Sequence, residues 1–516
     1  MTLVDAFAGS AQKRLDKVAL YWGEKEFSYR QLLEQSAPVG RELQQKFQVK
    51  PGDRVGLWMK NCPEFVPGLF GILQAAAVVV PINNFLKPHE VNYILEDAGI
   101  DVVITDEELS VHLPALQAAR AGLRGFEIQG FIRNIQYSVF SVQCSETEAV
   151  RSGSKGLLSP ALSSKGGEGD GSSEELAVLI YTSGTTGRPK GAMLTHGNLI
   201  HNVESCRQVL KVSENDSLVI LLPMFHSYML TVGVLLPLLV GGSIVLVKSL
   251  HPMRNALHEI LQRRPTILPA IPQFYRSILN APLPIPLPFR ICVSGAAPLP
   301  KQVLKEFEEK FHVPLIEGYG LSEASPVVTK NPLDGQRKAG SIGLPIPRVE
   351  LSIQDESGRE LKHDEVGEVC VRGGNVMKGY WRQPEETAKV MRNGWLLTGD
   401  IGYRDADGYY YITDRKKDML LVNGINVYPR EIEEILYQFP GVKEAAVIGR
   451  PDTRKGEQPV AYVAANEGVA LEEKALQHFV RERLADYKIP RRVIFLPALP
   501  RNATGKILKT ALREMA

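Results

Sequence analysis

The feature that most constrains the fold is a stretch rich in glycine and hydroxyl side chains, residues 181–191, which follows a short apolar run. The apolar run, residues 176–180, predicts a buried strand. A glycine-rich turn after a strand lets backbone N–H groups converge on an anion. Hydroxyl donors, backbone room and positive charge come from Thr182, Ser183, Gly184, Thr185, Thr186, Gly187 and Lys190. The stretch therefore predicts a loop that binds the phosphates of a triphosphate.

This stretch differs from a P-loop, because its second glycine is not followed by Lys-Ser or Lys-Thr. The alternative interpretation is a surface loop that binds nothing, as many loops of this composition do. The dense hydroxyl groups, the buried strand before them and the Pro-Lys-Gly stop at residues 189–191 favour phosphate binding.

Predicted strands and helices alternate along most of the chain, which indicates a largely parallel sheet with helices on both faces. A hairpin is expected at residues 19–29. The strands expected after it are 54–59, 78–81, 101–105, 218–222, 244–247 and 291–294, and the helices are 64–76, 89–98, 253–263, 272–280 and 300–310. The fold class predicted for this part is α/β, with stacked, largely parallel sheets.

Two further regions have a different pattern of predicted elements. Residues 343–411 hold short predicted strands with many glycines, which indicates a smaller β-rich subdomain. After Arg415 the pattern predicts a compact α+β module, with helices at 429–438 and 472–484 and strands at 444–449, 458–464 and 492–495. We therefore expect an N-terminal domain of residues 1–414 and a small, mobile C-terminal domain of residues 415–516.

Residues 151–174 predict a flexible linker, because 13 of these 24 residues are serine or glycine. Residues 228–247 carry no charge and are long enough to span a bilayer. However, Pro237 and the pair Gly241-Gly242 interrupt them, and a buried helix, turn and strand is the favoured interpretation over a membrane span.

Composition excludes some classes of function. The net charge of +2 gives no reason to expect a nucleic-acid partner. The five cysteines are scattered without metal-ligand spacing, which fits reduced thiols. Residues 1–16 have no apolar signal-peptide core. A cytoplasmic location without a transmembrane segment is expected.

Five later motifs carry candidate binding residues. Small residues after the strand at 291–294, namely Gly295, Ala296 and Ala297, leave a slot for a flat ring at the edge of the sheet. In the stretch 317–323, Tyr319 has backbone room to lie against a base, Ser322 can donate to a phosphate and Glu323 offers a hard oxygen to Mg²⁺. Asp400 can accept from vicinal hydroxyl groups. The charged run 414–418 lies at the predicted domain boundary, and Lys506 follows a predicted tight turn at Thr504-Gly505.

Together these motifs, in this order, closely resemble those of the adenylate-forming (AMP-binding) superfamily, and residues 317–330 and 414–434 resemble its long- and medium-chain fatty acyl-CoA synthetases most. The resemblance implies that Asp400 and Arg415 bind ribose and phosphate, that Lys417 is a hinge, and that Lys506 is catalytic. It also implies nucleotide binding by the phosphate loop and by Gly295, Ala296, Ala297, Glu317, Gly318, Tyr319, Gly320, Ser322 and Gly424. Where this chain has Ser322, the superfamily more often has threonine, and the hydroxyl group is kept.

The implied activity is ATP-dependent synthesis of a fatty acyl-CoA in two steps, through an acyl-adenylate, with CoA as the acceptor and Mg²⁺ held by Thr182 and Glu323. His226 is a second expected catalytic residue, and residues 225–239 are expected to line an acyl tunnel. Peripheral contact with a membrane and oligomerisation are both compatible with this interpretation. Four alternatives stay open: transfer to a carrier protein, a short-chain or aromatic acid, a kinase or simple nucleotide hydrolase, and a membrane-embedded protein.

Overall fold

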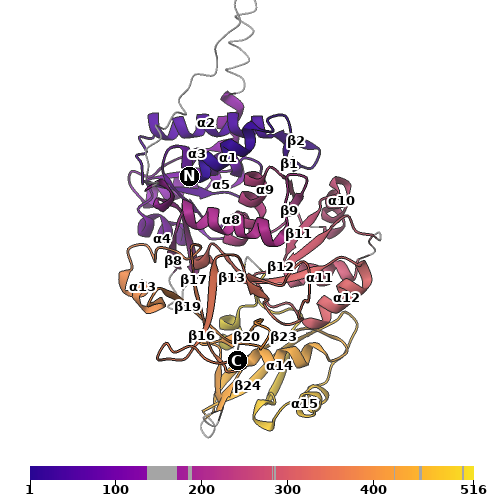
Figure 1. Ribbon diagram of the computed structural model, residues 1–516. Helices are drawn as coiled ribbons and strands as arrows, with labels where there is room; N and C mark the ends of the chain where they lie inside the picture. Colours follow the sequence, from indigo (N-terminus) through magenta and orange to yellow (C-terminus); the bar gives the residue numbers. More distant parts are fainter. Residues whose placement is uncertain are drawn as a thin grey trace, which may run out of the picture.

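The computed structural model describes residues 1–135, 171–183, 189–250, 252–281, 283, 286–422, 425–452, 456–502 and 505–515. Four sheets organise these residues (Figure 1). Two large sheets occupy the N-terminal part, in the upper half of the figure, and a small sheet near the C-terminus lies at the opposite end. The α/β fold predicted from the alternating pattern is confirmed.

The first large sheet contains the strand that precedes the phosphate loop. Its described strands have the order β6 (Arg124–Glu127), β5 (Val102–Thr105), β3 (Arg54–Trp58), β4 (Val78–Pro81), β7 (Leu176–Ser183) and β8 (Pro189–Thr195). The strands from β6 to β7 pair in parallel, and helices α3 (Phe65–Gln74) and α4 (Pro88–Ala98) connect strands of the sheet. This arrangement places the C-terminal end of β7 at the edge where ligands bind in open α/β sheets.

One local expectation in this sheet was wrong. Residues 189–191 do not stop the chain but begin strand β8, which pairs antiparallel with β7 so that Lys190 lies opposite Thr182. The chain reverses between the two strands, and the ladder satisfies backbone groups that would otherwise be buried without partners. The lysine is therefore held by a strand instead of a loop.

The second large sheet is parallel in the middle and antiparallel at both ends. Its described strands have the order β15 (Leu344–Pro345), β14 (Val327–Lys330), β13 (Leu315–Gly320), β12 (Ile291–Ser294), β11 (Ile267–Ala270), β9 (Ser217–Ile220), β10 (Ser243–Leu246), β1 (Val18–Trp22) and β2 (Lys25–Ser28). Helices α10 (Met253–Arg263), α11 (Pro272–Leu279) and α12 (Lys301–Phe311) pack on it through a buried apolar cluster. The hairpin predicted at residues 19–29 is β1 and β2.

One continuous core joins helices to both sheets. It includes side chains of α1 (Leu3–Gln12), α2 (Tyr29–Gln45), α3, α8 (His196–Leu210), the π-helix η2 (Met229–Leu235) and α9 (Leu236–Val240). The uncharged residues 228–247 form helix, turn and strand as predicted, because Gly241 turns the chain with a φ of 94° before β10. Among the described residues, no helix is both long and apolar enough to cross a bilayer.

The β-rich subdomain is an antiparallel sheet. Its strands are β16 (Val349–Gln354), β17 (Gly367–Gly373), β18 (Met391–Arg392), β19 (Trp395–Arg404) and β20 (Tyr410–Arg415), and the short helix α13 (Pro384–Val390) precedes β18. The last strand ends at Arg415, the residue after the predicted domain boundary. The short helices α5 (Glu107–Ser110) and α6 (Leu113–Ala119) lie in the first large-sheet region, and η3 (Ser322–Ala324) follows β13.

The C-terminal residues build their own sheet and apolar core (Figure 1). The strands are β21 (Leu420–Val422), β22 (Ile425–Val427), β23 (Val442–Asp452), β24 (Gly456–Ala465) and β25 (Arg492–Phe495), and the helices are α14 (Pro429–Tyr437), α15 (Glu473–Arg481), η4 (Asp486–Lys488) and α16 (Lys509–Glu514). The sequence pattern missed the short hairpin of β21 and β22 and the last helix, because each is too short for a periodic signal.

The linker expected at residues 151–174 lies mostly outside the described residues. Its last four residues form the 3-10 helix η1 (Gly171–Glu174). The carbonyl oxygen of Glu174 accepts a hydrogen bond of 3.0 Å from Nζ of Lys378. This contact ties the chain that enters β7 to the segment that precedes α13.

Candidate active site

A cavity of about 540 Å³ opens where the carboxyl ends of β12 and β13 face the C-terminal residues. The turn after β20, helix α14 and the loop that follows β25 form its other walls. Its lining includes ten of the residues predicted from sequence, which are Ala296, Ala297, Glu317, Gly318, Tyr319, Gly320, Asp400, Arg415, Lys417 and Lys506. The structure thus brings residues from five separate motifs to one place.

Asp400 lies in the wall of this cavity and is only 3% exposed. The antiparallel pairing of β19 with β20 sets it opposite Arg415, and Nε of Arg415 lies 2.8 Å from its Oδ1. The Asp400 carboxylate raises the pKa of the Arg415 guanidinium further. A charged carboxylate at this depth is an acceptor suited to a pair of vicinal hydroxyl groups.

Lys506 reaches the same cavity from the loop after β25. The loop is closed by Asn502, whose Oδ1 accepts from the backbone N–H of Lys506 at 2.9 Å and whose carbonyl oxygen accepts from Gly505 at 2.9 Å. Burial and the nearby Arg415 guanidinium lower the pKa of the Lys506 ammonium to about 8. Lys506 is therefore a cation at neutral pH that can lose its proton in mildly basic solution.

Gly505 allows this loop to sit against the N-terminal part of the chain. Its φ of 82° favours glycine, and a Cβ at this position would lie 2.4 Å from Cδ1 of Ile271. A side chain on residue 505 would therefore push the loop away. Thr504, predicted to share this turn, lies outside the described residues.

Glu317 provides a polar wall to the cavity at the end of β13. It is 4% exposed, and its Oε1 accepts from the backbone N–H of Leu299 at 3.0 Å. Its Oε2 has no hydrogen-bond partner in the part of the chain that the structure describes. Burial raises the pKa of this carboxyl to about 7. The free oxygen suits a ligand with an amino group.

The small residues after β12 divide between two roles. Ala296, with a φ of 64°, and Ala297 line the cavity. Gly295 instead packs under the ring of Tyr228, where an added Cβ would lie 3.1 Å from Cζ. The hydroxyl of Tyr228 donates to the carbonyl oxygen of Val293 at 3.1 Å, so this ring is fixed. Of the three residues expected to form a slot for a flat ring, the two alanines therefore line the cavity and the glycine does not.

The two residues expected to hold Mg²⁺ are neighbours in space. Oγ1 of Thr182 donates to Oε1 of Glu323 at 3.3 Å, although the residues are 141 positions apart. The hydroxyl of Tyr380 donates to the same carboxylate oxygen at 2.9 Å. A hydroxyl and a carboxylate side by side are hard oxygen ligands, and they fit a magnesium ion that keeps waters and phosphate oxygens as its other ligands.

Lys190 does not project freely toward a ligand. Its side chain is 9% exposed and forms an ion pair with Glu386 of α13. Its Nζ also lies 5.4 Å from the centre of the Tyr380 ring. Sequence reasoning missed both partners, because they follow Lys190 by nearly 200 positions and neither belongs to a phosphate-binding pattern.

Ser322 and His226 lie beside these residues. Oγ of Ser322 is 2.9 Å from Oγ of Ser227. The Ser322 hydroxyl, which was predicted to donate to a phosphate, therefore has a protein partner in this structure. His226 follows β9, and burial lowers the pKa of its imidazole to about 4, which keeps it neutral at physiological pH. Its Nδ1 accepts from the backbone N–H of Tyr228 at 3.3 Å.

The predicted residues of the phosphate loop are only partly described. Ser183 ends β7, opposite Pro189 of β8. Gly184, Thr185, Thr186 and Gly187 lie outside the described residues, as does Gly424 between β21 and β22. The two strands that carry the ends of the loop nevertheless fix where it begins and ends.

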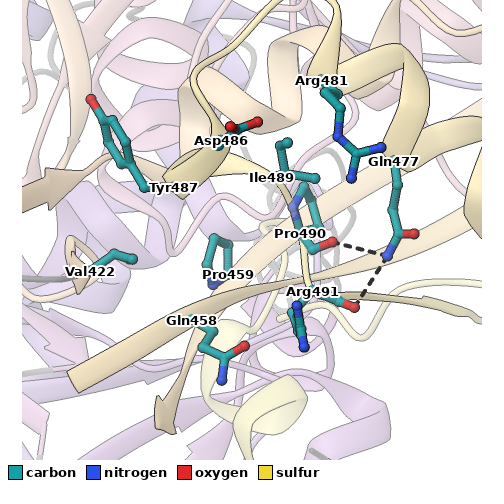
Figure 2. Close-up of a pocket in the computed structure, with 10 residues that line it drawn as sticks. All are labelled: Val422, Gln458, Pro459, Gln477, Arg481, Asp486, Tyr487, Ile489, Pro490 and Arg491. Carbon is teal, nitrogen blue, oxygen red and sulfur yellow. Dashed lines mark hydrogen bonds between the residues drawn. The ribbon is translucent and has the colours of Figure 1, made fainter. Parts of the chain in front are cut away.

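A second hollow, of about 460 Å³, lies within the C-terminal sheet region (Figure 2). Its rim carries the guanidinium groups of Arg481 and Arg491 and the ring of Tyr487. Nε2 of Gln477 donates to the carbonyl oxygens of Pro490 and Arg491, both at 3.1 Å, and fixes one wall. No salt bridge to either arginine occurs within the described residues, so the rim can receive an anion.

Comparison with known proteins decides the family. The model of the AMP-binding enzyme family matches residues 7–381, and that of the AMP-binding enzyme C-terminal domain matches residues 431–506. The chain belongs to the AMP-binding enzyme family. The membership expected from the sequence motifs is confirmed, and this AMP-binding enzyme matches both family models.

Named relatives of this AMP-binding enzyme are CoA ligases. A long-chain-fatty-acid–CoA ligase of Bacillus subtilis is 36% identical, over 99% of this chain and 94% of the relative. A feruloyl-CoA synthase of Amycolatopsis is 35% identical, over 90% of this chain and 89% of the relative. The solved structure of an anthranilate CoA ligase in complex with anthranoyl-AMP matches with a TM-score of 0.88 at 30% identity, over 100% of this chain and 97% of that chain. The acids named for these relatives are fatty in one case and aromatic in two.

Proposed function

We propose that this enzyme is an ATP-dependent fatty acyl-CoA ligase that forms an acyl-adenylate and then a thioester with CoA. The observation that carries the proposal is the convergence of Lys506, Asp400 and Arg415 on one cavity. A lysine from the C-terminal loop faces two residues that suit a ribose and a phosphate. Such an arrangement serves a reaction in which charge develops on a nucleotide phosphate next to a carboxylate.

In the first step the carboxylate of the acid attacks the α-phosphorus of ATP, and pyrophosphate leaves. A carboxylate is a weak nucleophile, so positioning and charge stabilisation supply most of the rate. The ammonium of Lys506 bridges the acid and the α-phosphate. Asp400 holds the ribose, and the base lies against Ala296, Ala297 and residues 317–320. Lys190 and the phosphate loop hold the leaving pyrophosphate.

Thr182 and Glu323 would hold Mg²⁺ beside the phosphates. When bound, the ion would supply positive charge that neutralises the phosphate oxygens as pyrophosphate leaves. The hydroxyl of Tyr380 orients the Glu323 carboxylate for this role through its 2.9 Å hydrogen bond.

In the second step the sulfur of CoA attacks the acyl carbon of the mixed anhydride, and AMP leaves. Lys506 occupies the cavity in this structure, so the thiol can reach the acyl group only after the loop withdraws. We place the hinge at Lys417, in the turn after β20, between a domain of residues 1–414 and a mobile domain of residues 415–516.

The hollow of Figure 2 is a candidate site for the nucleotide end of CoA, which carries several phosphates. Arg481 and Arg491 can pair with phosphate groups, and the Tyr487 ring can stack on a base. Replacing both arginines with alanine should raise the KM for CoA and leave the KM for ATP unchanged. An unchanged KM for CoA would remove the hollow from the CoA site.

The proposed acid is an unbranched fatty acid of medium to long chain. Residues 228–236 are buried around η2, shortly after His226, and apart from the hydroxyl groups of Tyr228 and Thr231 their side chains are apolar, so they can line a tunnel for an alkyl chain. The second candidate is an aromatic acid. The Tyr228 ring, fixed over Gly295, favours it, because a tunnel closed by this ring would fit only a short or flat acid.

The two candidates are separated by kcat/KM across acids from acetate to palmitate, together with benzoate and ferulate. Each buried CH₂ contributes about 0.8 kcal/mol, so a fatty acid ligase should gain roughly fourfold per carbon until the tunnel is full. A profile that stays flat from butyrate to laurate, with a maximum at an aromatic acid, would select the second candidate. The Tyr228→Ala variant should then shift preference toward longer chains.

A further inference from the structure

The pairing of Lys190 with Glu386 joins the phosphate-binding region to a helix that no motif assigns. Lys190 is on β8 and Glu386 is in the first turn of α13, and the two are 196 positions apart. The Lys190 ammonium is almost enclosed, between the Glu386 carboxylate and the Tyr380 ring, whose centre is 5.4 Å away. A buried ammonium group of this kind must have a counter-charge.

The helix that carries Glu386 is firmly fixed to β8. The backbone N–H of Trp381 donates to Gly191 at 2.8 Å, and that of Met193 donates to Gly379 at 2.9 Å. The backbone N–H of Tyr380 also donates to Oγ1 of Thr387 in α13, at 2.8 Å. These hydrogen bonds hold the start of α13, and Glu386 with it, beside β8.

The Glu386 carboxylate forms ion pairs with two lysines. One oxygen pairs with Lys190 and the other with Lys389, which is 67% exposed and lies one turn later on α13. The two ammonium groups, Lys190 first, lower the pKa of Glu386 to about 2, so the carboxylate stays ionised at any working pH. The charge that faces Lys190 thus depends on how strongly Lys389 competes for it.

We propose that Glu386 is a positioning residue that competes with the triphosphate for Lys190. In the nucleotide-free enzyme the carboxylate holds the ammonium in place. When phosphates arrive, they share or replace that carboxylate, and the close negative charge weakens their binding and speeds the departure of pyrophosphate. This inference rests on the proposed function, in which Lys190 contacts the leaving phosphates.

Removing the charge of Glu386 should strengthen binding of phosphates, because the competitor is lost while the shape of the side chain is kept. In the Glu386→Gln variant we expect ATP and pyrophosphate to bind about three- to tenfold more tightly. The Lys389→Ala variant should act in the opposite direction and weaken binding by roughly two- to threefold, because the whole carboxylate charge then falls on Lys190. A residue that served only folding would weaken binding when replaced.

The matched control is Glu385→Gln. Glu385 is the exposed neighbour in the same turn of α13, so the change in net charge is the same without the contact to Lys190. Calorimetry with pyrophosphate and with an ATP analogue whose α,β-bridge is methylene gives the affinities without acid or CoA. Stopped-flow release of pyrophosphate in the full reaction should be slower in Glu386→Gln.

Tighter binding in Glu386→Gln, with Glu385→Gln unchanged and Lys389→Ala weaker, is the expected result. Weaker or unchanged binding in Glu386→Gln, or an equal effect in Glu385→Gln, would overturn the inference. If Glu386→Gln does not fold, the Lys389→Ala variant decides: weaker binding of pyrophosphate supports the inference, and unchanged or tighter binding overturns it. A wild-type enzyme that binds neither probe would contradict the proposed function itself, which keeps the two failures distinct.

Discussion

The hydroxyl of Tyr319 donates to Oδ2 of Asp400 at 2.5 Å, across 81 positions of sequence. The other oxygen of this carboxylate pairs with Arg415. These two contacts hold both oxygens of a buried acid in the wall of the cavity. A ribose diol that enters can take the place of these donors without any new charge being buried.

Asp400→Asn should raise the KM for ATP by about 10- to 100-fold, because a hydrogen bond to a charged group contributes about 1.5–3 kcal/mol. The loss should depend on the ribose hydroxyls. The wild-type enzyme should therefore bind 2′,3′-dideoxy-ATP as poorly as Asp400→Asn binds ATP. The variant should bind ATP and 2′,3′-dideoxy-ATP equally well. Retained discrimination would show that Asp400 does not hold the ribose.

Lys506→Ala should abolish formation of the acyl-adenylate but leave thioester formation from supplied acyl-AMP largely intact. The reason is that the ammonium is needed where charge builds on the α-phosphate, in the first step alone. Separate assays of the two half-reactions check this. Equal loss in both would show that Lys506 has another role.

The pH dependence of adenylation should follow the pKa of Lys506. The ammonium form is the active one, so kcat/KM for the first step should fall as pH rises through about 8. Lys506→Arg keeps its charge to much higher pH. The fall should therefore move to higher pH in this variant, at reduced maximal rate. A profile that is the same in both enzymes would assign the transition to another group.

Gly505→Ala should slow adenylation by about tenfold or more, because the added Cβ meets Ile271 and the positive φ is strained. Thioester formation from supplied acyl-AMP should change little. Ile271→Val removes the Cδ1 atom that the new Cβ would meet. The double variant should therefore recover part of the lost rate, and no recovery would show that this contact does not position the loop.

Lys330→Met should stabilise the protein, most at neutral and acidic pH. Lys330 on β14 is 5% exposed, its Nζ has no hydrogen-bond partner among the described residues, and burial lowers its pKa to about 7. In the unfolded chain this lysine is protonated below about pH 10.4, whereas in the folded protein it is protonated only below about pH 7. Lys330 therefore lowers the free energy of unfolding progressively as pH falls from about 10.4 to about 7, and the loss is complete below about pH 7. Melting temperatures of the two proteins should differ by several degrees at pH 6 and converge above pH 10. A difference that does not depend on pH would contradict this.

Much of the fold followed from local pattern. Strands such as β3 and β12 are short apolar runs bounded by breakers, and α12 has helical periodicity, so both kinds of element were predicted to within a few residues. Strand β8 was missed because its polar start, Pro189-Lys190-Gly191, resembles the end of a loop. Its strand conformation is set by pairing with β7, a partner that periodicity does not show.

The candidate site was predictable where a motif is contiguous. Residues 317–320 and Asp400, Arg415 and Lys506 were each singled out locally, and the fold brings them together. Contacts between distant residues could not be predicted in that way. Glu386 beside Lys190, Tyr380 on Glu323 and Tyr228 over Gly295 are all set by tertiary packing, and none has a signature in its own stretch of sequence.

The most direct test of the central claim is acid-dependent exchange of labelled pyrophosphate into ATP, measured with Mg²⁺ and without CoA. Adenylation as the first step predicts exchange that requires a carboxylic acid, proceeds without CoA and is lost in Lys506→Ala. With CoA added, the products should be AMP, pyrophosphate and a thioester. Absence of exchange with every acid in a panel of fatty and aromatic acids, or formation of ADP and phosphate, would contradict the account.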